Sequence, residues 1–227
     1  MSEKKQLAVV TGASSGIGLQ MAHLLAGKGY NLILTARRED RLVKTADILR
    51  KKHSIEVFGV ASDLIDPSSP LELYQECMKI SRKSALPLTI LINNAGMGQW
   101  KPFVDTSIKR QLRGIQLNIA ALTELSYYFV RTMKEHGEQS YIMNVSSLVS
   151  FLPALNYAVY AASKAYVRHF SEVLCFELER TNIHVHCFCP GGTVSEFMNA
   201  AGQQTTKFAS RGLMSAKKVA ETGLGDM

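Results

Sequence analysis

Short apolar runs alternate with amphipathic stretches along most of this chain. Apolar runs bounded by turn residues are typical of buried strands, and apolar positions at helical spacing are typical of amphipathic helices. On these patterns the predicted strands cover residues 7–10, 31–35, 56–62, 88–93, 141–146 and 184–189. The predicted helices cover residues 16–28, 38–53, 70–84, 106–135 and 156–179, and a further helix begins near residue 216.

The predicted strands are almost wholly apolar, with little alternation between polar and apolar residues. Such strands are typical of parallel sheets that helices cover on both faces. Because crossovers between parallel strands are right-handed, the expected fold is α/β, a doubly wound parallel sheet of the Rossmann type in three layers. No linker, repeat or composition shift divides the 227 residues, so residues 1–227 are predicted to form a single domain.

Composition narrows the class of protein. Apolar residues make up 46% and charged residues 20% of the chain, which argues against disorder. No apolar run approaches the ~18 residues that a membrane-spanning helix needs, and the short polar start leaves no room for a signal peptide. We therefore expect a cytoplasmic protein without a transmembrane segment. The net charge of +7 comes from scattered Lys and Arg, so we expect no nucleic-acid partner.

Histidines and cysteines gather at residues 184–189, in a composition that also occurs in metal sites. The same stretch is predicted to be a strand, in which successive side chains point to opposite faces. His184 and His186 would then lie on one face and Cys187 and Cys189 on the other. Because one ion would not reach all four side chains, we expect a strand and no metal.

A glycine-rich turn, TGASSGIG at residues 11–18, joins the first predicted strand to the first predicted helix. Gly12 allows the tight turn, Gly16 lets a pyrophosphate approach the backbone, and Gly18 permits close helix packing. The helix N-terminus behind the turn offers unpaired N–H groups and the positive end of a dipole. The turn therefore predicts a dinucleotide site at the carboxyl edge of the sheet.

The end of the second strand distinguishes between the two nicotinamide cofactors. NAD sites usually carry an acidic residue there for the ribose 2′-hydroxyl, whereas NADP needs a cation for its 2′-phosphate. This chain has Ala36 followed by Arg37 and Arg38, and a guanidinium pairs with phosphate through two parallel hydrogen bonds. The arginines would alternatively cap the following helix. The lack of an acid at Ala36 favours NADP(H).

Tyr160 and Lys164 lie four residues apart in a predicted helix and therefore share one of its faces. A free tyrosine has a pKa near ~10, and a neighbouring ammonium lowers that pKa toward the range useful for proton transfer. Ser147 follows the fifth strand, at the edge where such sheets bind ligands, so its hydroxyl would reach the reacting oxygen. These residues predict acid–base chemistry beside the dinucleotide.

Taken together, these pieces resemble the short-chain dehydrogenase/reductase family over essentially the whole chain. The motifs that carry the resemblance are TGASSGIG at 11–18, NNAG at 93–96, Asn118, Ser147, YAASK at 160–164 and PGGTVS at 190–195. They occur in the order that the family has. The resemblance implies an NADP(H)-preferring reductase of carbonyl or 3-oxoacyl groups, in which the hydride chemistry belongs to the cofactor.

The resemblance also implies catalytic roles. Tyr160 would donate a proton to the carbonyl oxygen during reduction and accept one during oxidation. Lys164 would lower the pKa of that tyrosine and hold the nicotinamide ribose. Ser147, chosen over Ser146 for its spacing from the tyrosine, would polarise the oxygen. Asn118 would anchor a water in the proton relay.

Cofactor binding draws on several loops under the same resemblance. Asp63 would contact the adenine, Asn93 the neighbouring ribose, and the backbone near Thr193 the nicotinamide carboxamide. The implied cofactor-binding residues are Gly12, Ser14, Ser15, Gly16, Ile17, Gly18, Arg37, Arg38, Asp63, Asn93, Ala95, Gly96, Tyr160, Lys164, Pro190, Gly191, Thr193 and Ser195.

Segments beside the expected cleft bear on substrate and assembly. By analogy with the family, residues 195–211 would form a mobile lid over substrate. The residues that would form an apolar wall, or else lie in the core or on the surface, are Trp100, Leu152, Tyr157, Phe197 and Met198. Family members commonly pair as homodimers or homotetramers through their long helices. The residues that would form such a seam, or else belong to the core, are Tyr166, Val167 and Phe170.

The sequence departs from the family pattern near its end. Family members run on through a further helix and a last strand, whereas this sequence stops soon after residues 216–221 begin that helix. We therefore expect the sheet to lack the family's last strand. The edge left open would lower stability or take a partner strand.

Two functions are compatible with these residues. The first is NADPH-dependent reduction of a small-molecule ketone or 3-oxoacyl group to an alcohol, or the reverse reaction. The second is a non-catalytic NADP(H)-binding regulator that keeps the fold without turnover. The complete set of Asn118, Ser147, Tyr160 and Lys164 favours the enzyme, because a pure binder does not need a perturbed tyrosine.

Overall fold

A parallel β-sheet forms the centre of the molecule in the computed structural model, which describes residues 6–203 and 212–225. Within these residues the main sheet has six strands in the order β3-β2-β1-β4-β5-β6, and all neighbouring strands are parallel. They are β1 (Leu7–Thr11), β2 (Asn31–Ala36), β3 (Val57–Ala61), β4 (Leu88–Asn93), β5 (Ser140–Val145) and β6 (Ile183–Phe188). The strand order reverses between β1 and β4, which creates the crevice where doubly wound sheets bind ligands.

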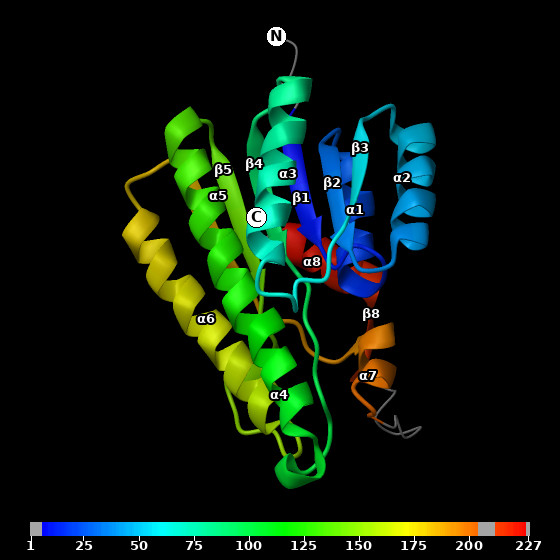
Figure 1. Ribbon diagram of the computed structural model, residues 1–227, viewed down its shortest axis with the longest axis vertical. Coiled ribbons are helices and arrows are strands. Elements are labelled where there is room, and N and C mark those ends of the chain that lie inside the picture. Colours follow the sequence, from blue (N-terminus) through cyan, green and yellow to red (C-terminus); the bar gives the residue numbers. More distant parts are fainter. Residues whose placement is uncertain (1–5, 204–211, 226–227) are drawn as a thin grey trace.

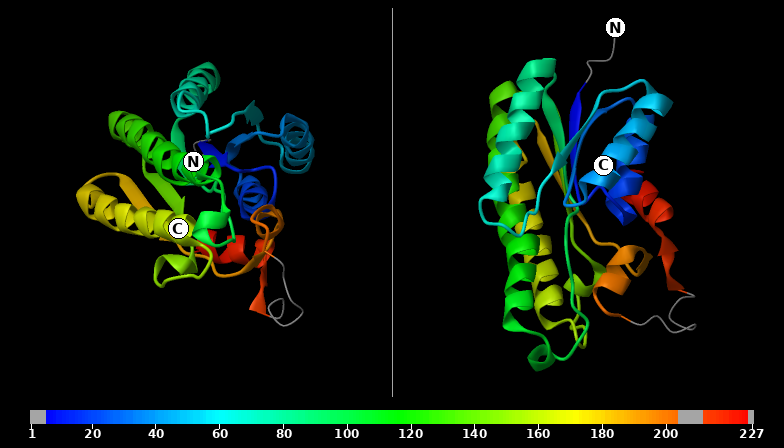
Figure 2. Two further views of the ribbon diagram at one scale, coloured as in Figure 1. Left: turned by 60° about the horizontal axis from the view of Figure 1, so that its bottom comes forward. Right: turned by 45° about the vertical axis from the view of Figure 1, so that its right-hand side comes forward.

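Helices cover both faces of this sheet. Figure 2 (right) shows α3, α5 and α6 on one side of it and α1, α2 and α8 on the other. The helices are α1 (Gly16–Gly27), α2 (Glu39–His53), α3 (Ser69–Ser84), α4 (Ile108–Ile115), α5 (Leu122–His136), α6 (Ala158–Leu178), α7 (Glu196–Ala200) and α8 (Ala216–Gly225). In Figure 1, α4 and α7 lie beyond the carboxyl ends of the strands. The three-layer α/β fold expected from the sequence is confirmed.

Alternate residues of the central strands pack into opposite cores. In β1, Ala8 and Val10 join the core beneath α1, α2 and α8, whereas Leu7 and Val9 join the core beneath α3, α5 and α6. All of them are fully buried. Burying a Val or Leu side chain contributes about 1.5–3 kcal/mol, so both faces of the strand favour apolar residues. This double burial is the physical reason for the unbroken apolar runs in the sequence.

The long helix expected over residues 106–135 is divided. A short 3₁₀ turn, η1 (Phe103–Asp105), precedes α4, and a π-helical segment, η2 (Gln116–Ala121), joins α4 to α5. Such π segments are rare and are frequent at functional sites. Here the segment contains Asn118, whose side chain is buried. The amphipathic spacing of the sequence does not show where a helix widens in this way.

The chain after β6 returns across the carboxyl edge of the sheet. The two-residue strands β7 (Thr193–Val194) and β8 (Met214–Ser215) pair in parallel, and α7 lies between them in the sequence. The expected lid at residues 195–211 therefore begins with α7, and its residues 204–211 lie outside the described residues. Helix α8 is present as expected and packs Ala220 and Leu224 into the core beneath α1.

Strand β6 alternates its side chains between two faces, as predicted. Tyr141 of β5 stacks on His184 with ring centroids 5.3 Å apart, and its ring lies 6.4 Å from that of His186. Cys187 and Cys189 point to the other face, where their sulfur atoms are 3.7 Å apart. Among the described residues, no three His, Cys, Asp or Glu side chains gather as metal ligands would. No described helix is long and apolar enough to span a membrane.

The residues proposed for an oligomer seam divide between core and surface. Val167 is fully buried and does not belong to any surface, because it faces the sheet from α6. Tyr166 is exposed and Phe170 is half-buried, and their rings stack with centroids 5.9 Å apart. Only these two of the three residues are placed where another chain would reach them.

Candidate active site

A cleft of about 990 Å³ opens along the carboxyl edge of the sheet. The segments that follow β1, β2, β3, β4, β5 and β6 all contribute to its walls. The sequence-predicted site residues that line it are Gly12, Ser14, Ser15, Gly16, Ile17, Arg37, Arg38, Asp63, Ala95, Gly96, Ser147, Tyr160, Lys164, Pro190, Gly191, Thr193 and Ser195. The fold therefore brings most of the predicted residues together. Gly18, Asn93 and Asn118 are not part of the lining.

The turn between β1 and α1 requires glycine for two different reasons. Gly12 has a φ of +67°, which is in the left-handed region that side chains disfavour. Gly18 lies inside α1, where a Cβ would meet the side-chain amide of Asn94 and come within 2.6 Å of the Gly12 carbonyl oxygen. Because these two positions carry no side chain, the turn can pack closely against the loop after β4. The N-terminus of α1 then faces the cleft, where its N–H groups would meet a phosphate.

Thr11, which the sequence motif includes without an assigned role, ties this turn to the loop after β4. Its Oγ1 accepts hydrogen bonds from the backbone N–H groups of Asn94 and Ala95, each 2.9 Å long. The same hydroxyl donates to the Ile92 carbonyl at 3.2 Å. Bonds of this kind contribute about 1 kcal/mol each when buried, as Thr11 is. They hold two loops of the cleft in register.

A cluster of arginines lies where the sequence predicts the 2′-phosphate of NADP. Arg38 donates from Nη2 to the hydroxyls of Ser14 and Ser15, at 3.1 and 3.2 Å. The Nη1 atoms of Arg41 and Arg38 hold the two carboxylate oxygens of Glu196 at 2.6 and 2.8 Å. These hydrogen bonds from Arg41 and Arg38 hold the pKa of Glu196 below its usual range. The cluster thus binds one anion already and has the donors to bind a phosphate.

Asn93 lies in the core rather than in the cleft. Its Nδ2 donates to Asn144 Oδ1 at 2.9 Å and to Ser126 Oγ at 3.1 Å, and the side chain is buried. The expected ribose contact is therefore wrong for this side chain, because the last residue of β4 points between the sheet and α5. The next residues of the same loop, 94–96, line the cleft instead.

Asn118, on η2, forms hydrogen bonds to the loop after β4. Its Oδ1 accepts from the Met97 N–H at 2.9 Å, and its Nδ2 donates to the Met97 carbonyl at 2.8 Å and to Ser163 Oγ at 3.0 Å. A Cβ on Gly96 would lie 3.3 Å from Asn118 Oδ1 and 3.5 Å from Lys164 Nζ. Asn118 and Lys164 therefore approach the same point of this loop. The water relay expected of Asn118 stays a prediction.

Tyr160 on α6 and Ser147 after β5 both line the cleft, where the serine hydroxyl influences the pKa of the phenol. Burial raises the pKa of Tyr160 to about 12, although the hydrogen bond from Ser147 opposes the rise. Burial outweighs any lowering by Lys164 in this structure, so the net lowering expected for Tyr160 is not found. Lys164 Nζ lies 5.9 Å from the centroid of the Tyr160 ring and donates instead to the Val145 carbonyl at 2.7 Å. The phenol therefore keeps its proton at neutral pH.

Lys164 is itself buried, which lowers the pKa of its ammonium to about 8. Its backbone carbonyl accepts a hydrogen bond from Ser146 Oγ at 2.7 Å, so that α6 is tied to the segment after β5. The ammonium is mostly charged at neutral pH and lines the cleft beside the phenol. A cation at this position would stabilise negative charge that develops on Tyr160.

Aromatic side chains form the wall beside Tyr160. The rings of Tyr157 and Phe197 lie 5.2 and 5.3 Å from the Tyr160 ring, measured between centroids. Met198 also lines the cleft, as expected from the sequence. The residues expected in this wall that do not line the cleft are Trp100 and Leu152. The apolar wall therefore comes from the N-cap of α6 and from α7.

Several charged lining residues carry no motif and were not predicted. Helix α4 contributes the cations Lys109, Arg110 and Arg113, and α7 contributes Glu196. Arg110 reaches the opposite wall, where its Nη2 donates to the Ala200 carbonyl at 2.9 Å. These residues come from elements far apart in the sequence. Only the approach of α4 and α7 in the fold reveals that they share a cleft.

Known proteins resemble this chain in sequence as well as in fold. The family model described as short chain dehydrogenase matches residues 6–206. The chain belongs to the short-chain dehydrogenase/reductase family. One curated relative is sulfoacetaldehyde reductase 2 of Chromohalobacter salexigens, which is 31% identical over 192 residues. That alignment covers 84% of this chain and 74% of the relative.

A second relative of this chain is the very-long-chain 3-oxoacyl-CoA reductase of Candida glabrata, which is 32% identical over 195 residues. The alignment covers 78% of this chain but 54% of the relative, so the chain spans about half the length of that reductase. The relatives named here are reductases, and the chain is accordingly an NAD(P)-dependent oxidoreductase of the short-chain dehydrogenase/reductase family.

Solved structures of the family superpose closely on this chain. A short-chain dehydrogenase from Sphingobium yanoikuyae in complex with NADPH matches with a TM-score of 0.88 and 31% identity, covering 97% of this chain and 83% of that one. The bulky-bulky ketone specific alcohol dehydrogenase from Comamonas testosteroni matches with a TM-score of 0.84 and 29% identity. That match covers 97% of this chain and 82% of the dehydrogenase.

Proposed function

We propose that this chain reduces a ketone or 3-oxoacyl carbonyl to an alcohol with NADPH, and that Tyr160 donates the proton. The observation that carries the proposal is that Ser147, Tyr160 and Lys164 line the same cleft as the glycine-rich turn. NADPH bound in that cleft would supply the hydride. The protein supplies position, proton and charge.

The arginine cluster supports NADPH over NADH. A 2′-phosphate carries more negative charge than the Glu196 carboxylate and offers more acceptor oxygens to Arg38 and Arg41. It would therefore take over the bonds that these arginines make to Glu196. The 2′-hydroxyl of NADH has no charge with which to compete. The NADPH complex of the Sphingobium relative supports the same preference.

The proposed proton transfer follows from the placement of three side chains. The substrate carbonyl oxygen would accept hydrogen bonds from Ser147 and Tyr160, which line the same cleft. As negative charge develops on that oxygen, Tyr160 donates its proton, which a phenol of high pKa holds until then. The Lys164 ammonium stabilises the phenolate that is left. This arrangement favours reduction near neutral pH, since the resting phenol is already the acid.

The cleft supports a substrate with an apolar body. Tyr157, Phe197 and Met198 line it next to Tyr160 and would contact the flanks of a ketone. The cations at the start of α4, Arg110 among them, would suit an anionic group at the far end of the substrate. Relatives named as reductases of 3-oxoacyl-CoA and of sulfoacetaldehyde act on carbonyl compounds with such groups.

The test is NADPH consumption with a panel of ketones and 3-oxoacyl thioesters, for the wild type and for Tyr160→Phe. We expect the variant to bind NADPH normally but to lose about 10²–10⁴-fold in turnover, the usual contribution of general acid catalysis. Tyr166→Phe, which removes an exposed hydroxyl of the same helix, is the matched control and should keep full turnover. NADPH binding without turnover on any carbonyl would favour the non-catalytic regulator instead.

A further inference from the structure

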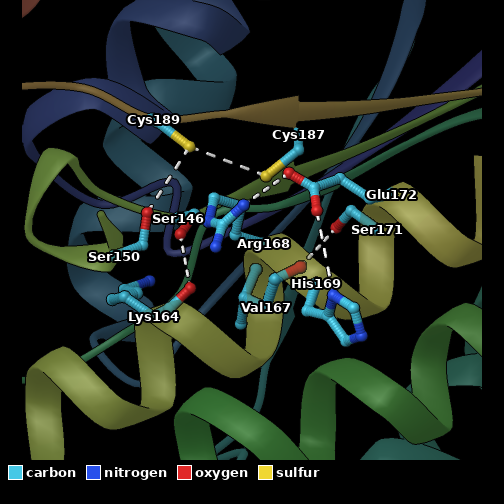
Figure 3. A network of polar contacts seen from close by, with 10 residues as sticks. All are labelled: Ser146, Ser150, Lys164, Val167, Arg168, His169, Ser171, Glu172, Cys187 and Cys189. Carbon is cyan, nitrogen blue, oxygen red and sulfur yellow. Dashed lines mark hydrogen bonds and ion pairs between the residues drawn. The ribbon is translucent and has the colours of Figure 1, made fainter. Parts of the chain in front are cut away.

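Two cysteines that the proposed chemistry does not use lie at the end of β6. Cys187 and Cys189 are two residues apart on an extended segment, so their side chains point to the same face. Their sulfur atoms are 3.7 Å apart, and both side chains are half-buried. Figure 3 shows the pair between β6 and α6, with Ser150 Oγ 3.9 Å from the sulfur of Cys189. Neither cysteine lines the cleft.

We propose that Cys187 and Cys189 form a redox-sensitive dithiol, which a hydroperoxide oxidises to a disulfide that distorts the Ser147 loop and slows turnover. The effect on turnover rests on the proposed function, whereas formation of the disulfide does not. The proposal adds a modification site to the protein and links it to the cleft through the backbone.

The surroundings of the two thiols give them different roles. The hydrogen bond from the Cys187 thiol, together with bonds from Ser150 and Ser146, lowers the pKa of Cys189 to about 6. The nearby Arg168 guanidinium acts in the same direction. Donating that hydrogen bond, together with burial, raises the pKa of Cys187. Cys189 is therefore the nucleophilic thiolate, and Cys187 is the thiol that resolves the intermediate.

The oxidation proceeds in two balanced steps. The Cys189 thiolate attacks one oxygen of the hydroperoxide and breaks the O–O bond, which leaves a sulfenic acid on Cys189 and releases an alkoxide or hydroxide that takes a proton from solvent. The Cys187 sulfur then loses its proton and attacks the sulfenic sulfur, which forms the S–S bond and releases water. Two thiols are oxidised, and one hydroperoxide is reduced to an alcohol or water, with release of one further water.

Closing this bond displaces the backbone. The sulfur atoms must approach from 3.7 Å to the ~2.05 Å of a disulfide. Residues two apart in an extended strand have Cα atoms about 6.6 Å apart, close to the upper end of the ~4.4–6.8 Å that disulfides span. The bond therefore pulls the two residues together. The displacement falls on Cys189, since Cys187 is held within the β5–β6 ladder and Cys189 follows the last ladder residue.

Backbone hydrogen bonds carry that displacement into the cleft. The amides on either side of Ser147 donate to the carbonyls on either side of Cys189, at 2.7 and 2.9 Å. The two segments are thus tied together directly at the serine that meets Tyr160. A misplacement of about 1 Å at a reacting group can cost about 100-fold in rate. We therefore expect a turnover loss of about tenfold or more in the disulfide form.

The first experiment measures the bond itself, on the wild-type protein treated with hydrogen peroxide and then alkylated. Cleavage with trypsin leaves both thiols in the peptide 181–207, whereas the exposed Cys175 lies in another peptide and serves as the internal control. We expect peptide 181–207 to lose two hydrogens at peroxide concentrations that leave Cys175 alkylatable, and dithiothreitol to restore it. Oxidation of Cys175 before any two-hydrogen loss would overturn the proposal.

The second experiment measures the consequence, with NADPH-dependent turnover of the reduced and oxidised protein. Cys187→Ser and Cys175→Ser should both match the reduced wild type within about twofold. After peroxide, the wild type and Cys175→Ser should lose about tenfold or more, reversibly with dithiothreitol, and Cys187→Ser should not. Cys189→Ala repeats the test from the other sulfur in case one variant fails to fold. Disulfide formation with unchanged turnover would refute the link to Ser147.

A separate outcome identifies failure of the proposed function. If the reduced wild type turns over no carbonyl, the same oxidised and reduced samples are compared for NADPH affinity and thermal midpoint. If oxidation shifts the NADPH affinity or the thermal midpoint, and Cys187→Ser abolishes that shift, the redox switch is supported although the proposed reductase activity is not. If the disulfide forms and neither the NADPH affinity nor the thermal midpoint changes, the proposed switch is refuted.

Discussion

At the scale of single residues, burial decides where protons lie in the cleft. It raises the pKa of Tyr160 to about 12 and lowers the pKa of Lys164 to about 8, in each case toward the neutral form. The attraction between an ammonium and a phenolate would act in the opposite direction. In the resting site burial outweighs that attraction, and the Lys164 ammonium donates to the Val145 carbonyl. The resting site therefore holds a neutral acid beside a lysine that titrates just above neutrality.

Turnover in the reducing direction should fall as pH rises through about 8. The pKa of Lys164 is lowered to about 8, so above that pH the ammonium loses its proton and no longer stabilises the Tyr160 phenolate. The measurement is the pH profile of kcat/KM for the wild type and for Lys164→Met. The variant should be slow throughout and should lack this limb. A wild-type profile that stays level well above pH 8 would show that the charge on Lys164 is not required.

Arg38→Ala should weaken NADPH binding much more than NADH binding. The substitution removes a guanidinium whose charge-assisted bonds to a phosphate are worth about 1.5–3 kcal/mol, which is about 10–100-fold in Kd. Fluorescence titration with each cofactor measures the two affinities. Arg131→Ala, which removes an exposed arginine of α5 instead, is the matched control. Equal weakening of NADPH and NADH would contradict a role in reading the 2′-phosphate.

At the scale of elements, close contacts between α1 and neighbouring loops set which positions accept a side chain. Helix α1 holds both Gly18, which is wedged against the β4 loop, and Gly27, whose nearest neighbour would lie 3.8 Å from a Cβ. The two glycines belong to one helix and differ only in what surrounds them. The π-helical segment η2, between α4 and α5, is a second example of a close contact with this loop. It turns Asn118 toward the loop after β4.

Gly18→Ala should destabilise the protein by about 1–3 kcal/mol, the usual cost of overpacking, because its Cβ would meet backbone as well as a side chain. Gly27→Ala should be neutral or should stabilise by about 0.5–1 kcal/mol, since alanine restricts the unfolded chain. Chemical denaturation of the two variants and the wild type gives both free energies. Similar values for the two variants would mean that the β4 loop yields to the added methyl.

At the scale of the whole molecule, three neighbouring helices expose apolar side chains to solvent. Apolar and aromatic side chains of α4, α5 and α6 are exposed to solvent. They include Ile108, Leu112, Tyr127, Tyr166, Val173 and Phe176. Figure 1 shows these helices side by side. An exposed apolar surface of this kind marks an interaction site in many proteins. It agrees with the expectation that copies of this chain pair through the long helices.

We expect a homodimer or homotetramer in solution that depends on this surface. Phe176 is 78% exposed, and replacing it and Val173 together with lysine should shift the protein toward monomer by burying charge in the contact. Sedimentation velocity measures the state of the wild type and the variant. Leu155→Lys, at a residue 87% exposed outside these helices, is the control and should leave the assembly intact. A wild type that sediments as a monomer would show that the surface serves another purpose.

The strands, most helix bounds, the three layers and the site at the glycine-rich turn could all be predicted from the sequence alone. These features depend on periodicity and on short spacings, which are properties of one segment at a time. Tyr160 and Lys164 could be paired in advance for the same reason, because four residues of helix bring two side chains to one face.

Other features depend on how elements far apart in the sequence approach one another in the fold. Asn93 lies in the core, Glu196 is held between Arg38 and Arg41, and the loop of Ser147 is bonded to that of Cys189. The fold also sets the balance between burial and charge at the proposed acid. Such features depend on which segments meet and how much water they exclude, and no single stretch of sequence carries that information.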